Sequence, residues 1–322
     1  MGDATANVEP EANNDSSGME TTHSNLRCFL DSVTPIVETH KVPKPPFLPL
    51  PNNYCGKVID GVKCFYLGDL WNKFYEWSTC GVGTPVRLPS GETVVQYFVP
   101  YLSAIQLYTN NNNVPTPQSL GWHSDYNVIH GRRFDDYNKN GFINTMYPKG
   151  YEAPSHISKL GDKSPRSICK GELFFKYFEL DSPYEREPFV DKVYELSCNC
   201  PSLASLSSLE LSPSSWVSVF WYPMSHVPAK NLKDLNTCFL TYHSLSTSEE
   251  YVPLDSWNAF DHLALAPFGL ATHKLDHKVW ASPKSGDQEH ISSLFGAAQS
   301  WLKKNNIYHN DFNYFLRNNF ST

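Results

Sequence analysis

The sequence predicts an α+β fold: a single domain with a twisted, mostly antiparallel sheet of about five to seven strands and helices packed over it. The first observation is a pair of strand-like runs over residues 216–222 and 238–243, dense in aromatic and β-branched side chains. The second is a set of amphipathic segments with helical spacing. The third is size, because 322 residues with 40% hydrophobic and 14% aromatic content can fill one large core.

The domain is predicted to begin after an acidic tail and to carry a long insertion. Residues 1–24 hold five acidic residues, no Lys or Arg and few large apolar groups, so they are predicted to be disordered. Residues 25–322 are then a single α+β domain. Within it, residues 110–170 are rich in Asn, Gly, Pro and Asp, which predicts a flexible polar insertion.

The first half of the domain contains two predicted helices and a strand region. Apolar residues at helical spacing predict a helix that starts at residue 24 and ends at Pro35. A second amphipathic helix is predicted over 68–79, with glycines directly after it. Residues 93–108 predict a strand pair or one bent strand. Pro100 has no backbone N–H and should mark a bulge, a kink or an edge there.

The second half contains further strands and helices. The strands are predicted over residues 171–180, 216–222, 238–243 and, more weakly, 267–275. The run over 216–222 is apolar on nearly both faces, as in a central strand covered on both sides. Helices are predicted over 188–199 and 287–304, the second with Asp287 as its cap and two lysines at the negative end of its dipole.

Charge and composition limit the partners. The net charge is −7, and no basic stripe is present, so nucleic acid is not a predicted partner. No apolar run approaches the roughly 18 residues of a membrane span. The start of the chain lacks the basic-then-apolar order of a secretory signal. Eight scattered cysteines then suggest free thiols and a cytoplasmic or nuclear location.

The sharpest chemical pattern is His123-Ser124-Asp125. His-x-Asp places two metal-binding side chains on one side of an extended segment, and with His226 or His243 it would complete the facial triad of a non-haem Fe(II) oxygenase. The pair falls in the polar insertion, however, and no Arg lies within about a dozen residues after either distant histidine to hold a co-substrate carboxylate. Two surface-loop residues are the preferred interpretation, and no metal or cofactor is predicted.

Other patterns favour structural roles. Cys198 and Cys200 are separated by one residue, whereas paired zinc ligands need two to four. Cys238 and His243 project to opposite faces of one strand, so they cannot form a nucleophile–base pair. The charged cluster over 179–187 is interpreted as a solvated, partly ion-paired turn at a helix start. The sequence thus predicts no catalytic residue.

Aromatic residues supply the remaining functional hypothesis. Most should lie in the core, but rings that face solvent would be typical of a protein-interaction surface. The candidates for such an aromatic interaction face are Trp216, Trp221, Tyr222, Tyr101 and Tyr242.

Several long blocks in a fixed order resemble a known family. They include GDLWNKFYEWS, GELFFKYFELDSPYEREPFVDKV, LSPSSWVSVFWYP and APFGLATHKL, and together they span most of residues 24–281. These blocks are similar to the plant family described only as a domain of unknown function, DUF789. The resemblance implies a soluble, single-domain plant protein, and it brings no catalytic residue with it.

The function predicted from sequence is a non-catalytic protein-interaction or regulatory module with an unidentified protein partner. Its basis is the lack of a convergent set of acid, base, nucleophile and metal ligands in the sequence. The alternative is a small-molecule-binding protein or an enzyme of unassigned chemistry. Its most testable form is the iron oxygenase that would use His123, Asp125 and a distant histidine.

Overall fold

The computed structural model describes residues 23–42, 62–109, 171–183, 185–224, 235–247, 261–281 and 285–319. All but the last two residues of the predicted acidic tail lie outside the described residues, and so does the predicted insertion over 110–170.

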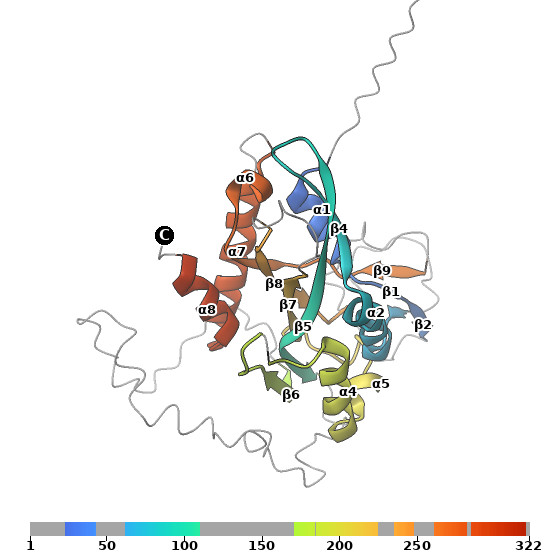
Figure 1. The fold of residues 1–322 in the computed structure, drawn as a ribbon. Helices are drawn as coiled ribbons and strands as arrows, with labels where there is room; N and C mark the ends of the chain where they lie inside the picture. Colours follow the sequence, from blue (N-terminus) through green and yellow to red (C-terminus); the bar gives the residue numbers. More distant parts are fainter. Residues whose placement is uncertain are drawn as a thin grey trace, which may run out of the picture.

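A six-stranded sheet forms the centre of the fold (Figure 1). Its order is β10-β8-β7-β5-β4, with β6 also paired to β5, and every pairing is antiparallel. The strands are β4 (Val82–Arg87), β5 (Thr93–Thr109), β6 (Glu172–Phe178), β7 (Trp216–Pro223), β8 (Cys238–Ser244) and β10 (Gly269–His273). Two short pairs lie apart from it: β1 (Ile36–Glu38) with β9 (His262–Ala264), and β2 (His40–Val42) with β3 (Val62–Cys64). The predicted α+β class with an antiparallel sheet is confirmed.

Strand β5 connects the other strands of this sheet, because it pairs with three of them. It runs unbroken for 17 residues and pairs with β7 along one edge. Along the other edge it pairs first with β4 and then with β6. Pro100 lies in the interval between these two pairings, and the β5–β7 bulge occurs instead at Ser103, the residue skipped between Leu102 and Ala104. Of the two predicted forms, one continuous strand is therefore correct, and Pro100 is accommodated without a bulge of its own.

Helices cover both faces of the sheet (Figure 1). The described helices are α1 (Asn25–Ser32), α2 (Leu67–Cys80), α4 (Phe189–Asn199), α5 (Ser202–Ser205), α6 (His277–Trp280), α7 (Asp287–Lys304) and α8 (Asn310–Asn319). The first core lies between one face of the sheet and α1, α2, α4, α5 and α6, with Ile291 of α7 at its margin. The second core lies between the opposite face and α7 and α8.

The first core is built from stacked rings. Phe29 of α1 stacks on Phe239 of β8 with ring centroids 3.9 Å apart, and Phe74 of α2 stacks on Phe189 of α4 at 4.1 Å. Trp221 of β7 packs edge-on to Phe29 at 6.5 Å. Such offset and edge-to-face contacts add to the free energy gained from burial. Phe29 thus attaches α1 to β7 and β8, and the Phe74–Phe189 contact joins α2 to α4.

The second core depends on a close approach of α7 to β10. A Cβ atom at Gly269 would lie 2.9 Å from the Cβ of Ala298, so only glycine allows α7 to lie this close to the strand. Trp216, Phe220 and Tyr242 of the sheet complete this core, all fully or almost fully buried. Strand β7 thus contributes large side chains to both cores and has a partner strand on each edge, as predicted for residues 216–222.

Strand β4 was not predicted, because Gly81, Gly83 and Pro85 read as turn signals. Gly81 does end α2, with φ +73°, but the edge strand begins at the next residue. Its outer edge is occupied at one point by Asn25. The Asn25 side chain accepts from Arg87 N over 2.7 Å and donates to Arg87 O over 2.8 Å, in the manner of a neighbouring strand.

Pro85 protects the same edge of β4. Alternate residues of an antiparallel strand direct their N–H and C=O groups to opposite edges, so Pro85 faces the same outer edge as Arg87. A proline there offers no donor to an incoming strand. The outer edge of β4 is therefore a poor template for adding another strand.

Candidate functional site

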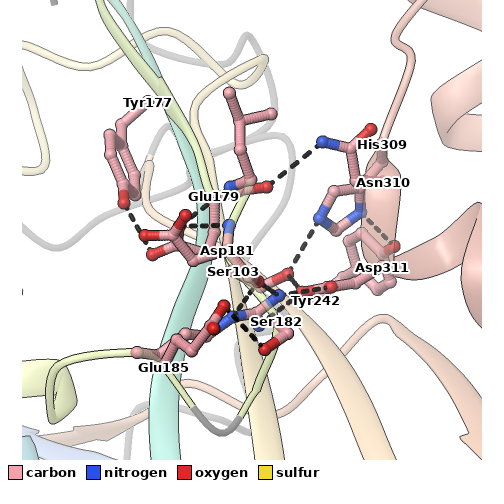
Figure 2. A network of polar contacts seen from close by, with 12 residues as sticks. Ser103, Tyr177, Glu179, Asp181, Ser182, Glu185, Tyr242, His309, Asn310 and Asp311 are labelled. Carbon is pink, nitrogen blue, oxygen red and sulfur yellow. Dashed lines mark hydrogen bonds and ion pairs between the residues drawn. The ribbon is translucent and has the colours of Figure 1, made fainter. Parts of the chain in front are cut away.

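A buried polar network joins the C-terminal helix to the sheet (Figure 2). Its members come from β5, the turn before α4, β8, and the start of α8; we call it the Asp311 network, and it comprises Ser103, Arg186, Tyr242, His309 and Asp311. The β5 bulge at Ser103 turns this side chain toward α8, which agrees with the role of bulges in re-aiming side chains. Sequence reasoning did not identify this site.

An ion pair lies at the centre of the Asp311 network. Arg186 donates from Nη1 to Asp311 Oδ2 over 2.8 Å and from Nη2 to Asp311 Oδ1 over 2.7 Å. Both side chains are almost entirely buried, with 3% and 7% of their surfaces exposed. The guanidinium also donates to the carbonyl of Asp181 and lies 5.2 Å from the centre of the Phe220 ring. This forked geometry pairs the Asp311 carboxylate with a permanent positive charge through two charge-assisted hydrogen bonds.

The hydrogen-bond directions in the network follow from the pairing of this carboxylate with Arg186. Asp311 can only accept, so the Ser103 hydroxyl donates to it. Ser103 Oγ must then accept from His309 Nε2, which lies 2.9 Å away. A neutral His309 with its proton on Nε2 accepts at Nδ1, so the Tyr242 hydroxyl, 2.7 Å away, is the donor. Every proton in this chain has an acceptor.

Ser103, His309 and Asp311 bring together the residue types of a hydrolase triad, but the arrangement differs from one. In a triad the serine proton goes to histidine and the carboxylate holds the other ring nitrogen. Here the serine proton goes to Asp311, and Tyr242 occupies the other nitrogen. All four side chains are buried, so they face each other and not solvent. Their arrangement fixes α8 on the sheet.

Burial also sets the protonation states in this network. It lowers the pKa of His309 to about 4, although the nearby Asp311 opposes the shift. It raises the pKa of Tyr242 well above its ordinary value, with Asp311 adding to the effect. At neutral pH both groups are uncharged, as the hydrogen-bond directions require.

Glu179 forms a second buried anchor beside this network (Figure 2). Its carboxylate accepts from the Tyr177 hydroxyl over 2.7 Å and from the backbone N–H groups of Leu180 and Asp181 over 2.8 and 3.0 Å. The solvated turn predicted over 179–187 is therefore wrong for Glu179 and Arg186. Both are buried because α8 and β5 pack over this segment, and both have specific partners.

His243 is the centre of a separate chain in the first core. Leu265 O can only accept, so His243 Nδ1 donates to it over 2.7 Å. Thr241 Oγ1 then donates to Nε2 over 2.9 Å and accepts from the indole N–H of Trp221 over 2.9 Å. Burial lowers the pKa of His243 to about 4. This is a satisfied core histidine, while Cys238 lies in the second core on the other face of β8.

These two histidines predict a loss of stability in mild acid. Burial lowers the pKa of His243 and of His309 from 6.5 to about 4, so below pH 6.5 the unfolded chain binds protons that the folded protein does not. The stability that the two neutral histidines contribute is fully present above about pH 6.5 and is lost as the pH falls toward 4. We expect each histidine to remove about 2 kcal/mol from the free energy of unfolding between pH 7 and pH 5.

Urea unfolding at stepped pH values measures this effect. The His243→Gln variant, which cannot be protonated, should show a shallower fall between pH 7 and pH 5 than the wild type. Equal free energies of unfolding for the wild type at pH 7 and pH 5 would contradict the assignment of neutral buried histidines.

The metal hypothesis concerns residues that the structure does not describe. His123, Asp125 and His226 all lie outside the described residues. Within the described ranges, no three His, Cys, Asp or Glu side chains are grouped closely enough to hold a metal ion. Cys200 is buried in the first core, in agreement with a packing role.

The structure divides the five aromatic candidates. Trp216, Trp221 and Tyr242 have no exposed surface, because β7 and β8 are central strands with helices over both faces. These three are core residues, so the prediction that they belong to an exposed aromatic face is wrong. Tyr101 and Tyr222 are partly exposed, and both lie on the sheet face that α8 covers only in part.

An apolar surface adjoins these two tyrosines. On this face, Val95 is 50% exposed and Met224 38% exposed, while the side chains between them are partly exposed. We call this surface the open face, and it comprises Pro85, Val95, Tyr97, Val99, Tyr222 and Met224. Cross-strand pairing brings Pro85 opposite Val95 and Val99 opposite Tyr222, so its residues from β4, β5 and β7 are contiguous. A contiguous apolar surface of this kind is typical of a binding site.

The comparisons with known proteins agree with the resemblance seen in the sequence. The family described as "Protein of unknown function (DUF789)" matches residues 24–315, and the chain belongs to this family. No curated protein and no solved structure matches the chain. In the described part of the chain, no helix has the length and apolar character that a membrane crossing requires.

Proposed function

We propose that this DUF789 domain is a non-catalytic protein-interaction or regulatory module, and that the open face is its contact surface. The observation that carries the proposal is the exposure of Val95, near the start of β5, and of Met224, directly after β7, beside partly exposed apolar side chains of the same sheet face. The Asp311 network supports it, since its acid, base and hydroxyl groups satisfy one another and serve to hold α8.

The composition of the open face suits binding to another protein. It combines two partly exposed tyrosines with aliphatic residues and methionine, the types enriched at the centre of interfaces. Tyr97 lies across Gly83 on β4, where a Cβ atom would come within 3.2 Å of the ring. The ring is therefore held in place by its own sheet, which lowers the entropy lost on binding. A plant source, a cytoplasmic or nuclear location and the lack of nucleic-acid binding remain predictions.

Two lysine substitutions on the open face test this proposal. The Val95→Lys/Met224→Lys variant should lose its partner, with affinity at least about 30-fold weaker, because charges replace two central apolar contacts. Its free energy of unfolding should change by less than about 1 kcal/mol, since both side chains are exposed.

Tyr194→Lys is the matched control, because Tyr194 is the most exposed large apolar side chain among the described residues and lies on α4, over the other face of the sheet. Proteins bound by the tagged wild type and by this control, but not by the double variant, are the expected result. The same set of proteins bound by all three would contradict the proposal.

A further inference from the structure

Helix α8 covers one part of the sheet face, and its contacts there show which side chains pack well against this face. Helix α8 places Phe315 edge-on to Phe220 of β7, with ring centroids 5.3 Å apart. Phe220 in turn stacks on Tyr222, at 6.4 Å and an interplanar angle of 17°. Tyr222 is partly exposed and belongs to the open face, so one row of rings continues from beneath α8 onto the open face. The open face is therefore the extension of an existing helix–sheet interface.

A strand is the other secondary structure that can dock to a sheet, and this sheet disfavours it. Strand addition needs a free edge with donors and acceptors. On β4, Pro85 presents no donor, and the side chain of Asn25 already occupies both backbone groups of Arg87. On the β4 side of the sheet, the face and not the edge is thus the surface suited to a partner.

The dimensions of the open face match one helix. Around Phe98, where β5 pairs with β4 on one edge and β7 on the other, three strands lie at spacings of about 4.8 Å and give a width of about 10 Å, the diameter of a helix with its side chains. Along β5 the face extends from Val95 to Val99, a length of about 14–17 Å with the adjoining side chains. This length accommodates about three helical turns.

From these observations we infer that the open face binds an amphipathic α-helix of a partner protein. The helix lies beside α8 in the same layer and turns large apolar residues at positions i, i+3 or i+4 and i+7 toward Val95, Tyr97 and Tyr222. This inference rests on the proposed function and specifies the form of the partner.

Selection from a random peptide library tests the inference without a known partner. Peptides of about 16 residues, long enough for about four turns, are selected on the full-length protein. We expect the enriched peptides to carry apolar residues at helical spacing and to gain helical circular dichroism when the protein is added. Their affinity should fall at least about 10-fold for Val95→Lys/Met224→Lys and should not change for Tyr194→Lys.

Enriched peptides with alternating apolar residues, or peptides that bind the double variant as well as the wild type, would overturn the inference. Failure to enrich any peptide that depends on Val95 and Met224 would overturn it as well. If such peptides lack helical spacing while protein partners are still lost in the double variant, the proposed function stands and only the helical form of the partner is wrong.

Discussion

Replacement of Asp311 by asparagine is expected to lower the free energy of unfolding by about 3–5 kcal/mol. The side chain keeps its shape and can still accept from Ser103, but the buried Arg186 loses the carboxylate that pairs with it directly and keeps only the electrostatic influence of Glu179. Because desolvation of an unpaired guanidinium is costly, the loss should exceed that of an ordinary hydrogen bond. Urea unfolding followed by tryptophan fluorescence measures it.

Two variants isolate the cause of this loss. Arg186→Met/Asp311→Asn removes the unpaired charge, so it should be more stable than Asp311→Asn alone. Asp31→Asn makes the same chemical change in the exposed Arg27–Asp31 pair and should cost less than about 1 kcal/mol. A loss below about 1 kcal/mol for Asp311→Asn would show that the buried ion pair does not hold α8 as described.

Replacement of Trp216 by alanine is expected to cost about 3–5 kcal/mol, because it leaves a large cavity in the second core. The ring is fully buried and contacts Phe178, Tyr242 and His309. Its indole N–H also donates to Gln106 Oε1 over 3.0 Å. The variant therefore loses packing against two strands and the segment before α8, together with a buried hydrogen bond.

A phenylalanine at position 216 separates these two contributions. Trp216→Phe keeps most of the ring but removes the shorter of two hydrogen bonds to Gln106 Oε1, so it should cost about 1–3 kcal/mol, less than the alanine variant. Chemical unfolding of both variants gives the comparison. If Trp216→Ala loses less than about 1 kcal/mol, β7 is not the central strand of this fold.

Local sequence patterns predicted those helices and strands whose burial follows one regular pattern along the whole element. Strand β7 was recognisable because it is apolar on both faces, and α7 because of its stripe and its terminal charges. Strand β4 was missed because Gly81 and Pro85 carry turn signals, and only the pairing with β5 makes a strand of this segment. In this segment, pairing with a neighbouring strand outweighs the local preference of glycine and proline for turns.

The Asp311 network could not be predicted from sequence. Ser103 and His309 are 206 residues apart, and neither lies in a motif. A bulge in β5 and the docking of α8 bring them together, and neither feature has a local signal. Arg186 was misread for the same reason: a charged residue in a turn is usually solvated, and only α8 buries it. The open face was predicted only through Tyr222 and its neighbour Tyr101, because sequence does not show where a helix layer stops.

Site-specific photo-crosslinking tests the role of the open face most directly. A benzophenone-bearing residue is introduced at Val95, at Met224 or, as control, at Tyr194, and the full chain is irradiated in cells. We expect crosslinks to a protein partner from positions 95 and 224, and none to that partner from position 194. Crosslinks to a partner from position 194 but from neither open-face position would contradict the assignment of the open face as the interaction surface.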